Sequence, residues 1–206
     1  MTLVKCSLFA AAVLASVSAS AKTCTWIGSS GNWSDGSKWQ DGAVPEDGDD
    51  VVFEGNAGAG GAIALEGRTT ARLASFTVTG GSGWNIQNGT LALQSGARVI
   101  DTGVTFEIGA DLASDGEVTL VKRGAGTLSL AGDNTATTQL VVEGGRLQPE
   151  NEGAYGPVPA TYKSDAIILR NGGVLSRPYA DNLTVVVGPT RGITLDGAGA
   201  LCARGF

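Results

Sequence analysis

The sequence predicts an all-β fold, a right-handed parallel β-helix (β-solenoid) whose short strands stack as successive coils. Apolar residues occur in short alternating runs, glycine is unusually frequent, and strands led by glycine recur at similar spacings. A β-sandwich or jelly roll is the alternative fold, because it also has strands every roughly 8 to 12 residues. The repeated glycine-led phrase favours the solenoid, since a sandwich has no reason to repeat one phrase regularly.

The first residues of the 206-residue chain are typical of a secretory signal peptide. Lys5 precedes an apolar run over residues 6–17, and Ala19, Ser20 and Ala21 form the small-residue pattern at which signal peptidase cuts. The run is too short to span a bilayer as a permanent helix. The sequence therefore predicts a signal peptide over residues 1–21 and no integral membrane segment after its cleavage.

Charge and residue usage exclude several classes of function. The net charge is −6 and becomes −7 once Lys5 is removed, which argues against nucleic acid or anionic lipid as a partner. The chain has no histidine, so a serine or cysteine nucleophile would lack its usual base. Cys24 and Cys202 remain after cleavage, near opposite ends of the chain, and whether they pair is left open.

Each expected strand is a short apolar run rich in Val, Ile, Leu and Thr with Gly, Asn or Asp at its edges. Such runs are too short for helices. In chain order the runs cover residues 51–53, 63–65, 76–78, 91–93, 104–108, 118–121, 128–130, 140–142, 167–169, 183–187 and 193–195.

Glycines that lead strands suggest the repeat. They are Gly89, Gly109, Gly126, Gly145, Gly173 and Gly192, separated by 20, 17, 19, 28 and 19 residues. The long interval contains an inserted loop at residues 149–165, whose Pro149, Pro157 and Pro159 are expected to lie outside a central sheet. Coils of roughly 19 to 22 residues predict some eight or nine turns. Asn88-Gly89 and Asn171-Gly172 are expected at sharp corners with positive φ.

Residues 122–147, KRGAGTLSLAGDNTATTQLVVEGGRL, resemble the autotransporter-associated β-strand repeat of surface-exposed and secreted bacterial β-helical proteins. The clearest repeat lies within residues 118–148. The resemblance implies a β-helical, passenger-type domain and carries over no catalytic residue. No barrel-sized segment follows the repeat, so the chain is expected to be a fragment or to leave the cell by another route. The structural repeat positions are Gly124, Gly126, Leu128, Leu130, Leu140, Val142, Gly144, Gly145 and Leu147.

Three tryptophans near the N-terminus have two interpretations. Trp26, Trp33 and Trp39 could stack on sugar rings as a glycan-binding platform. They could also cap the first coil, which has no preceding neighbour, and terminal repeats are expected to be atypical. The cap interpretation is favoured, and residues 22–55 are taken as an N-terminal cap before a repeat region over residues 56–206.

The sequence offers only weak candidates for a metal site or for catalytic residues. Residues 45–50, PEDGDD, have four acids but lack the spacing of a calcium loop, so a solvated turn is favoured over a metal site. No cofactor is expected. Carboxylates and basic residues of the kind used by β-helical lyases are Asp101, Glu107, Asp111, Asp115, Glu117, Lys122 and Arg123. Their spacing fixes no catalytic pair.

The sequence therefore predicts an exported scaffold or adhesin-like module, extracellular or at the cell surface, with no catalysis of its own. A carbohydrate-binding module is the alternative, and a polysaccharide lyase or glycosidase is the third. The partners implied are a surface polysaccharide or a host or neighbouring cell surface.

Overall fold

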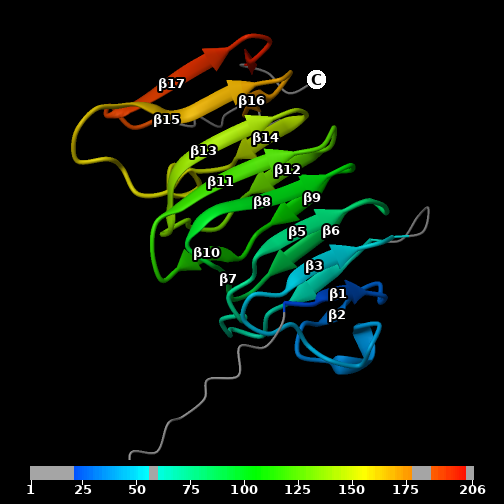
Figure 1. Ribbon diagram of the computed structural model, residues 1–206. Helices are drawn as coiled ribbons and strands as arrows, with labels where there is room; N and C mark the ends of the chain where they lie inside the picture. The colour runs from blue at the N-terminus through cyan, green and yellow to red at the C-terminus, as the bar shows by residue number, and fades with distance from the viewer. Residues whose placement is uncertain (1–20, 56–59, 178–186, 203–206) are drawn as a thin grey trace, which may run out of the picture.

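A computed structural model of the chain describes residues 21–55, 60–177 and 187–202. These residues form a β-solenoid of about 7 turns with parallel sheets and almost no helix, which confirms the predicted fold class (Figure 1). The signal-peptide residues 1–20 and most of the expected strand at 183–187 lie outside the described residues.

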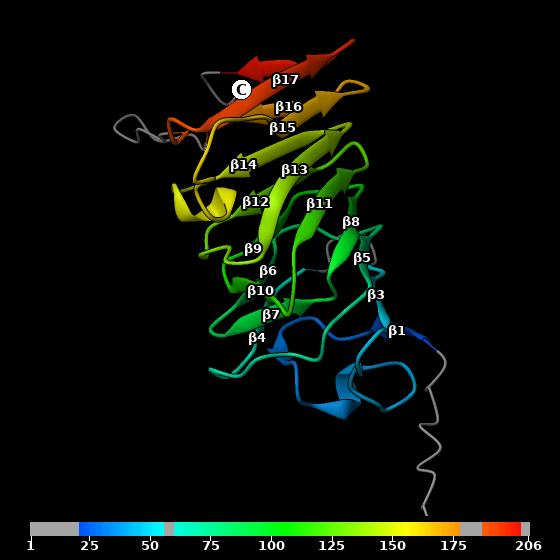
Figure 2. The same ribbon diagram turned by 60° about the vertical axis from the view of Figure 1, so that its left-hand side comes forward.

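Two eight-stranded parallel sheets run along the stack (Figure 2). Sheet A contains β1 (Thr23–Trp26), β3 (Asp50–Phe53), β5 (Ser75–Val78), β8 (Gly96–Thr102), β11 (Val118–Arg123), β13 (Thr137–Glu143), β15 (Lys163–Arg170) and β17 (Arg191–Asp196). Sheet B contains β2 (Gly31–Asn32), β4 (Ala62–Ala64), β6 (Trp84–Gln87), β9 (Phe106–Ile108), β12 (Thr127–Leu130), β14 (Arg146–Pro149), β16 (Val174–Ser176) and β18 (Ala200–Cys202). Most coils thus contribute one strand to sheet A and one strand to sheet B.

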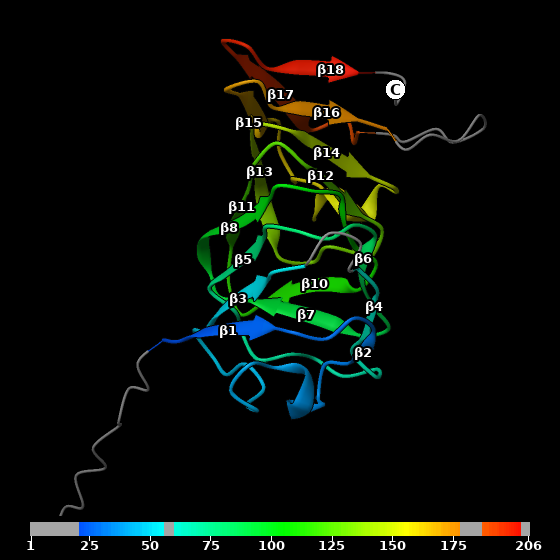
Figure 3. The ribbon, with the colours of Figure 1, turned by 90° about the vertical axis from the view of Figure 1, so that its right-hand side faces the viewer.

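A third side of the solenoid carries a two-stranded parallel sheet, sheet C, made of β7 (Thr90–Leu93) and β10 (Asp111–Ser114). Figure 3 shows these strands between the two large sheets. Two short 3₁₀ helices, η1 (Gly36–Lys38) and η2 (Gly153–Tyr155), lie in connections.

Apolar side chains of successive coils stack in register to form the core. In sheet B one inward row joins Trp84, Phe106, Leu128, Leu147, Leu175 and Leu201. Near the N-terminal end Phe53 and Phe76 stack with ring centroids 6.1 Å apart. Each coil buries its apolar residues against the next, so no coil is stable alone.

The coils are longer and less regular than the glycine spacing suggested. Successive strands of sheet A begin between 19 residues apart, at Val118 and Thr137, and 28 residues apart, at Lys163 and Arg191. Longer coils explain why the chain makes about 7 turns where eight or nine were expected.

The glycine-led phrases also belong to different sheets. Those at Gly126, Gly145 and Gly173 precede β12, β14 and β16, which are neighbours in sheet B. Those at Gly89 and Gly109 precede the strands of sheet C, and Gly192 lies within β17 of sheet A. The phrase therefore marks entry into a strand, whichever side of the coil that strand occupies.

The expected N-terminal cap and inserted loop both contain solenoid strands. Residues 22–55 hold β1, β2 and β3, which belong to sheets A and B. Pro149 is the last residue of β14, paired with Leu130 of β12, although it was expected outside a central sheet. Proline is tolerated at the end of β14 because β16, the next strand of sheet B, pairs only with Arg146 and Leu147. No residue of β16 pairs with Pro149.

Asparagine and glycine occupy corners as expected. Asn88 and Asn171 have φ of 61° and 53°, and Gly172 has φ of 81°. These left-handed conformations favour Asn and Gly over other residues, so the corner predictions are confirmed.

Candidate functional site

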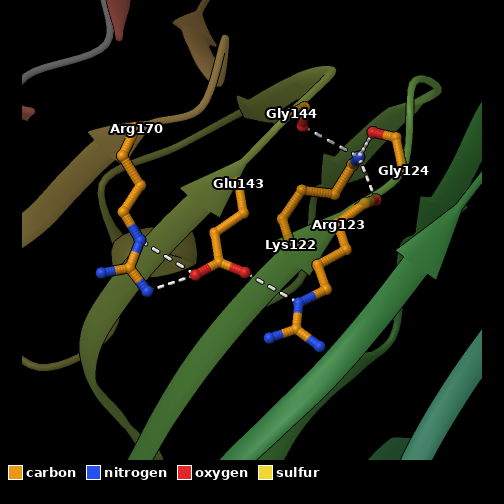
Figure 4. Close-up of polar contacts among 6 residues, drawn as sticks. All are labelled: Lys122, Arg123, Gly124, Glu143, Gly144 and Arg170. Carbon is orange, nitrogen blue, oxygen red and sulfur yellow. Dashed lines mark hydrogen bonds and ion pairs between the residues drawn. The ribbon is translucent and has the colours of Figure 1, made fainter. Parts of the chain in front are cut away.

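Lys122 is a buried lysine at the end of β11, and its side chain is 1% exposed. It occupies an inward row of sheet A, with Ile100 on one side and Val142 on the other. Its Nζ atom donates hydrogen bonds to the carbonyl oxygens of Arg123, Gly124 and Gly144, the last two at 2.8 and 3.4 Å (Figure 4). An ammonium group has three donors, and here all three meet backbone acceptors of two stacked corners.

Burial lowers the pKa of Lys122 to about 8, and the charge of Asp101 acts in the opposite direction. At neutral pH the side chain is therefore still mostly protonated. Its hydrogen bonds supply a donor to carbonyl oxygens of two stacked corners, which makes Lys122 a positioning residue for the corner.

The glycines around Lys122 are required for two different reasons. Gly124 and Gly145 have φ of 77° and 59°, where a side chain is strained. Gly126 has no such positive φ. A Cβ on it would, however, lie 2.1 Å from the carbonyl oxygen of Val104 in the preceding coil. At Gly145 a Cβ would also lie 2.4 Å from the carbonyl oxygens of Gly124 and Gly126. The corners of successive coils therefore stack without room for side chains.

A charged row lies on the outer face of sheet A beside this corner. Glu143 accepts hydrogen bonds from Arg123 at 2.7 Å and from Arg170 at 2.9 Å, both through Nε (Figure 4). The two arginines come from the coils before and after that of Glu143. Their hydrogen bonds lower the pKa of Glu143. The sequence analysis did not predict this charged row. The signal in the sequence was the alternating sign of the charges at the ends of successive strands.

Comparison with known families identifies the segment around the corner. Residues 120–148 match the passenger-associated-transport-repeat family. The segment is similar to a passenger-associated-transport-repeat. This confirms the resemblance proposed from residues 122–147. No curated protein and no solved structure matches the chain.

The matched segment begins within β11 of sheet A and continues through β12 and β13 to β14, so it contains strands of two successive coils. Its apolar residues Leu128, Leu140 and Leu147 are at most 1% exposed. Its lysine and glycines build the corner described above. The repeat thus contains the groups that join one coil to the next, and none of them faces an open cavity.

The three N-terminal tryptophans are buried, with Trp26, Trp33 and Trp39 exposed by 1, 5 and 2%. Trp39 lies edge-on between the other two, with ring centroids 5.1 Å from Trp26 and 4.8 Å from Trp33. Its indole N–H donates to the carbonyl of Trp33 at 2.9 Å. Their rings pack on the first coil, and no broad indole face is open to a sugar ring.

Trp33 does contribute to a surface hollow of about 190 Å³. Exposed Glu66 and Arg68 lie around this hollow with Ser34 and Thr70. Glu66 accepts hydrogen bonds from Asn32 and Ser34. The hollow combines an indole edge with polar groups.

The acids of the PEDGDD segment have separate structural partners. Asp49 is 3% exposed and accepts hydrogen bonds from the backbone N–H groups of Lys22 and Glu46. Asp47 is exposed and forms an ion pair with Arg72, which also pairs with Asp115 at 2.6 Å. Arg72 lies between two adjoining open depressions of about 420 and 370 Å³.

The seven residues considered for lyase or glycosidase chemistry do not converge. Asp101 and Arg123 lie on sheet A, Lys122 points inward, and Glu107 lies on sheet B, where Asn85 donates to it at 3.0 Å. Burial raises the pKa of Glu107, and Glu150 adds to the effect. Asp111, Asp115 and Glu117 lie in or beside β10 and the turn after it. Among these carboxylates, Asp101 has a charge that acts on Lys122.

Cys24 and Cys202 lie on β1 and β18, the first strand of sheet A and the last of sheet B. The length of the stack separates them, as the elongated fold predicts, so they cannot bridge to each other. Across the described ranges, no helix is both long and apolar enough to cross a membrane.

Proposed function

We propose that the protein is an exported scaffold with an adhesive or display role, located at the cell surface or in the medium, and without catalysis of its own. The observation that carries the proposal is that residues 120–148, which match the passenger-associated-transport-repeat family, lie in two successive coils of a continuous solenoid. Its polar groups are engaged in joining coils, as the contacts of Lys122 illustrate. A stiff stack of this kind holds connecting loops at fixed positions.

The position of Lys22 supports export with cleavage after Ala21. Its backbone nitrogen lies 3.0 Å from Oδ1 of buried Asp49, and β1 begins at Thr23. Cleavage there leaves every strand of the described residues in place and converts this nitrogen into an ammonium group beside a carboxylate. The new ion pair would stabilise the first coil of the mature chain.

The test of this proposal is fractionation of the producing cells with N-terminal sequencing of the recovered protein. The expected result is protein in the medium, or at a surface accessible to added protease, with Lys22 as its first residue. Protein retained inside the cell with residues 1–21 intact would refute the proposed export. Release of unsaturated uronates or reducing sugars from polysaccharides would refute the absence of catalysis.

Carbohydrate binding is the second candidate function, favoured by the hollow beside Trp33. A glycan array would test it with the variants Glu66→Gln and Arg68→Ala, which change exposed side chains and leave the tryptophan core intact. Binding that both variants abolish supports a site in this hollow. Glycan binding that neither variant changes would exclude a site in this hollow.

A further inference from the structure

Three surface depressions adjoin one another on the side of the solenoid that carries sheet C. The hollow of about 190 Å³ beside Trp33 shares Thr69 and Thr70 with a depression of about 370 Å³. That depression shares Arg72 and its two acidic partners with a third one, of about 420 Å³. The three depressions together form one groove, called here the Arg72 groove, and a ligand made of several units can contact all of them at once.

Short side chains of sheet C form the floor of the central depression. Ala92 of β7 and Ala113 of β10 pair directly with each other, and both line this depression. Leu91 and Leu112, the residues before them, are buried in the core. Because side chains alternate between the two faces of a strand, the alanine methyl groups face outward. They give the groove a small apolar floor that a longer side chain would fill.

Arg72 is held at a fixed position on the groove by two carboxylates. Its Nε atom donates to Asp47 at 3.0 Å and its Nη1 atom donates to Asp115 at 2.6 Å, although Asp115 lies 43 residues further along the chain. The backbone N–H of Arg72 also donates to Asp47, at 2.8 Å. The groove therefore presents a donor between two acceptors, already oriented by the contacts between coils. Carboxylate oxygens have several lone pairs, so both acids can accept further hydrogen bonds without releasing Arg72.

The charged side chains that line the Arg72 groove balance one another. They are the acids Asp47, Glu66 and Asp115 and the bases Arg68, Arg72 and Arg98. The negative and positive charges cancel in this groove, whereas the whole chain has a net charge of −6. Desolvating an ionised ligand costs free energy unless an opposite charge compensates it. A groove without net charge therefore favours an uncharged ligand.

We propose that the Arg72 groove binds a neutral polysaccharide, whose hydroxyl groups hydrogen-bond to Arg72, Asp47 and Asp115. Hydroxyl groups both donate and accept, so they match a donor that lies between two acceptors. The C–H groups on the face of a sugar ring pack on the methyl groups of Ala92 and Ala113, and successive sugar units occupy successive depressions. This inference rests on the proposed adhesive role and names its partner. It extends the contact with sugar well beyond the hollow beside Trp33.

A polymer of uronates fits the groove less well. Its repeated carboxylates would lie beside Asp47, Glu66 and Asp115, and the net charge of the chain opposes its approach. Neutral and acidic oligosaccharides of equal length therefore distinguish the two kinds of ligand.

The experiment is isothermal titration calorimetry of the protein with cellohexaose, xylohexaose, mannohexaose and hexagalacturonate. We expect at least one neutral hexasaccharide to bind, and to bind more tightly than hexagalacturonate. The disaccharide of the same sugar should bind more weakly, because it contacts fewer of the three depressions.

Two variants place the bound sugar in the groove. Ala113→Ile fills the central depression without changing Arg72, and Asp115→Ala removes one acceptor while Arg72 keeps its contacts with Asp47. Each should weaken binding by about tenfold or more. Ala62→Ile makes the same change as Ala113→Ile at an exposed position of β4 in sheet B and should leave the affinity unchanged. Thermal unfolding near the parental temperature establishes that each variant is folded.

The proposal is overturned if none of the neutral hexasaccharides binds, if Ala113→Ile leaves the affinity unchanged, or if hexagalacturonate binds most tightly. Binding that Glu66→Gln and Arg68→Ala abolish, but Ala113→Ile and Asp115→Ala do not change, would also overturn it. In that case the sugar occupies only the hollow beside Trp33, and carbohydrate binding as a function stands. Absence of binding by every probe leaves the proposed export and display role intact, since cell fractionation tests that role separately.

Discussion

The Nζ atom of Lys122 donates a hydrogen bond to the carbonyl oxygen of Gly144, 22 residues further along the chain and one coil higher in the stack. A single side chain thereby links two successive corners. The lysine of the repeat consequently serves the stacking of coils.

Replacing Lys122 by Met should destabilise the protein. The change removes all three hydrogen bonds to corner carbonyls, and we expect the free energy of unfolding to fall by about 1–3 kcal/mol. Urea titration at pH 7 measures the effect. Arg123→Met, on the exposed outer face, is the matched control and should stay within about 1 kcal/mol of the parent. Equal losses in both variants would contradict the role assigned to Lys122.

Stability should rise with pH just above pH 8. Burial lowers the pKa of Lys122 from 10.5 to about 8, so between these values the unfolded chain binds more protons than the folded chain. The free energy of unfolding therefore increases with pH in that window. Burial raises the pKa of Cys24 from 9.0 to about 11 and that of Tyr155 from 10.0 to about 12, which acts in the opposite direction at higher pH.

The clean interval for this effect is consequently between about pH 8 and pH 9. Urea titrations across it should show a positive slope for the parent and a smaller slope for Lys122→Met. A slope that persists unchanged in the variant would assign the pH dependence to other groups.

Gly145→Ala should be more damaging than Gly172→Ala. Both positions have positive φ, but a Cβ at Gly145 meets two carbonyl oxygens at 2.4 Å, whereas none lies within 4 Å of a Cβ at Gly172. We expect a loss of about 1 kcal/mol at Gly172 from conformational strain alone, and a larger loss at Gly145. Thermal unfolding of the two variants separates these causes, and equal losses would show that steric approach contributes little.

Leu128→Ala should cost about 2–5 kcal/mol, because the side chain is 0% exposed and its loss leaves a cavity. Ser129→Ala should cost about 0.5–3 kcal/mol, since the hydroxyl donates to Glu150 at 2.7 Å. Although Ser129 alternates with inward-facing Leu128 along β12, it is only 7% exposed. Denaturant titration of both variants tests the register, and a larger loss for Ser129→Ala would contradict it.

The fold class followed from local features of the sequence. Alternation placed Leu128 and Leu130 inward, and Asn88 and Asn171 marked corners, because these properties depend on residues close together in the chain. Strands such as β8 were not foreseen, since Arg98 and Asp101 interrupt the apolar pattern there. Asp101 lies on the outer face of the sheet, and Arg98 lies in the row of Leu120 at the start of the strand. Neither charge prevents a strand, but each hides it from a search for apolar runs.

The sequence by itself determined that glycine-led strands would stack as coils and that residues 122–147 resemble an autotransporter-associated repeat, a resemblance that the family match bears out. Only the tertiary structure decided which residues contact one another across coils. It placed the Trp33 indole inside the first coil, paired Arg72 with both Asp47 and Asp115, and brought Asp196 into register with Arg170. Coils of unequal length bring residues 19 to 32 positions apart into register, and no fixed spacing in the chain encodes those contacts.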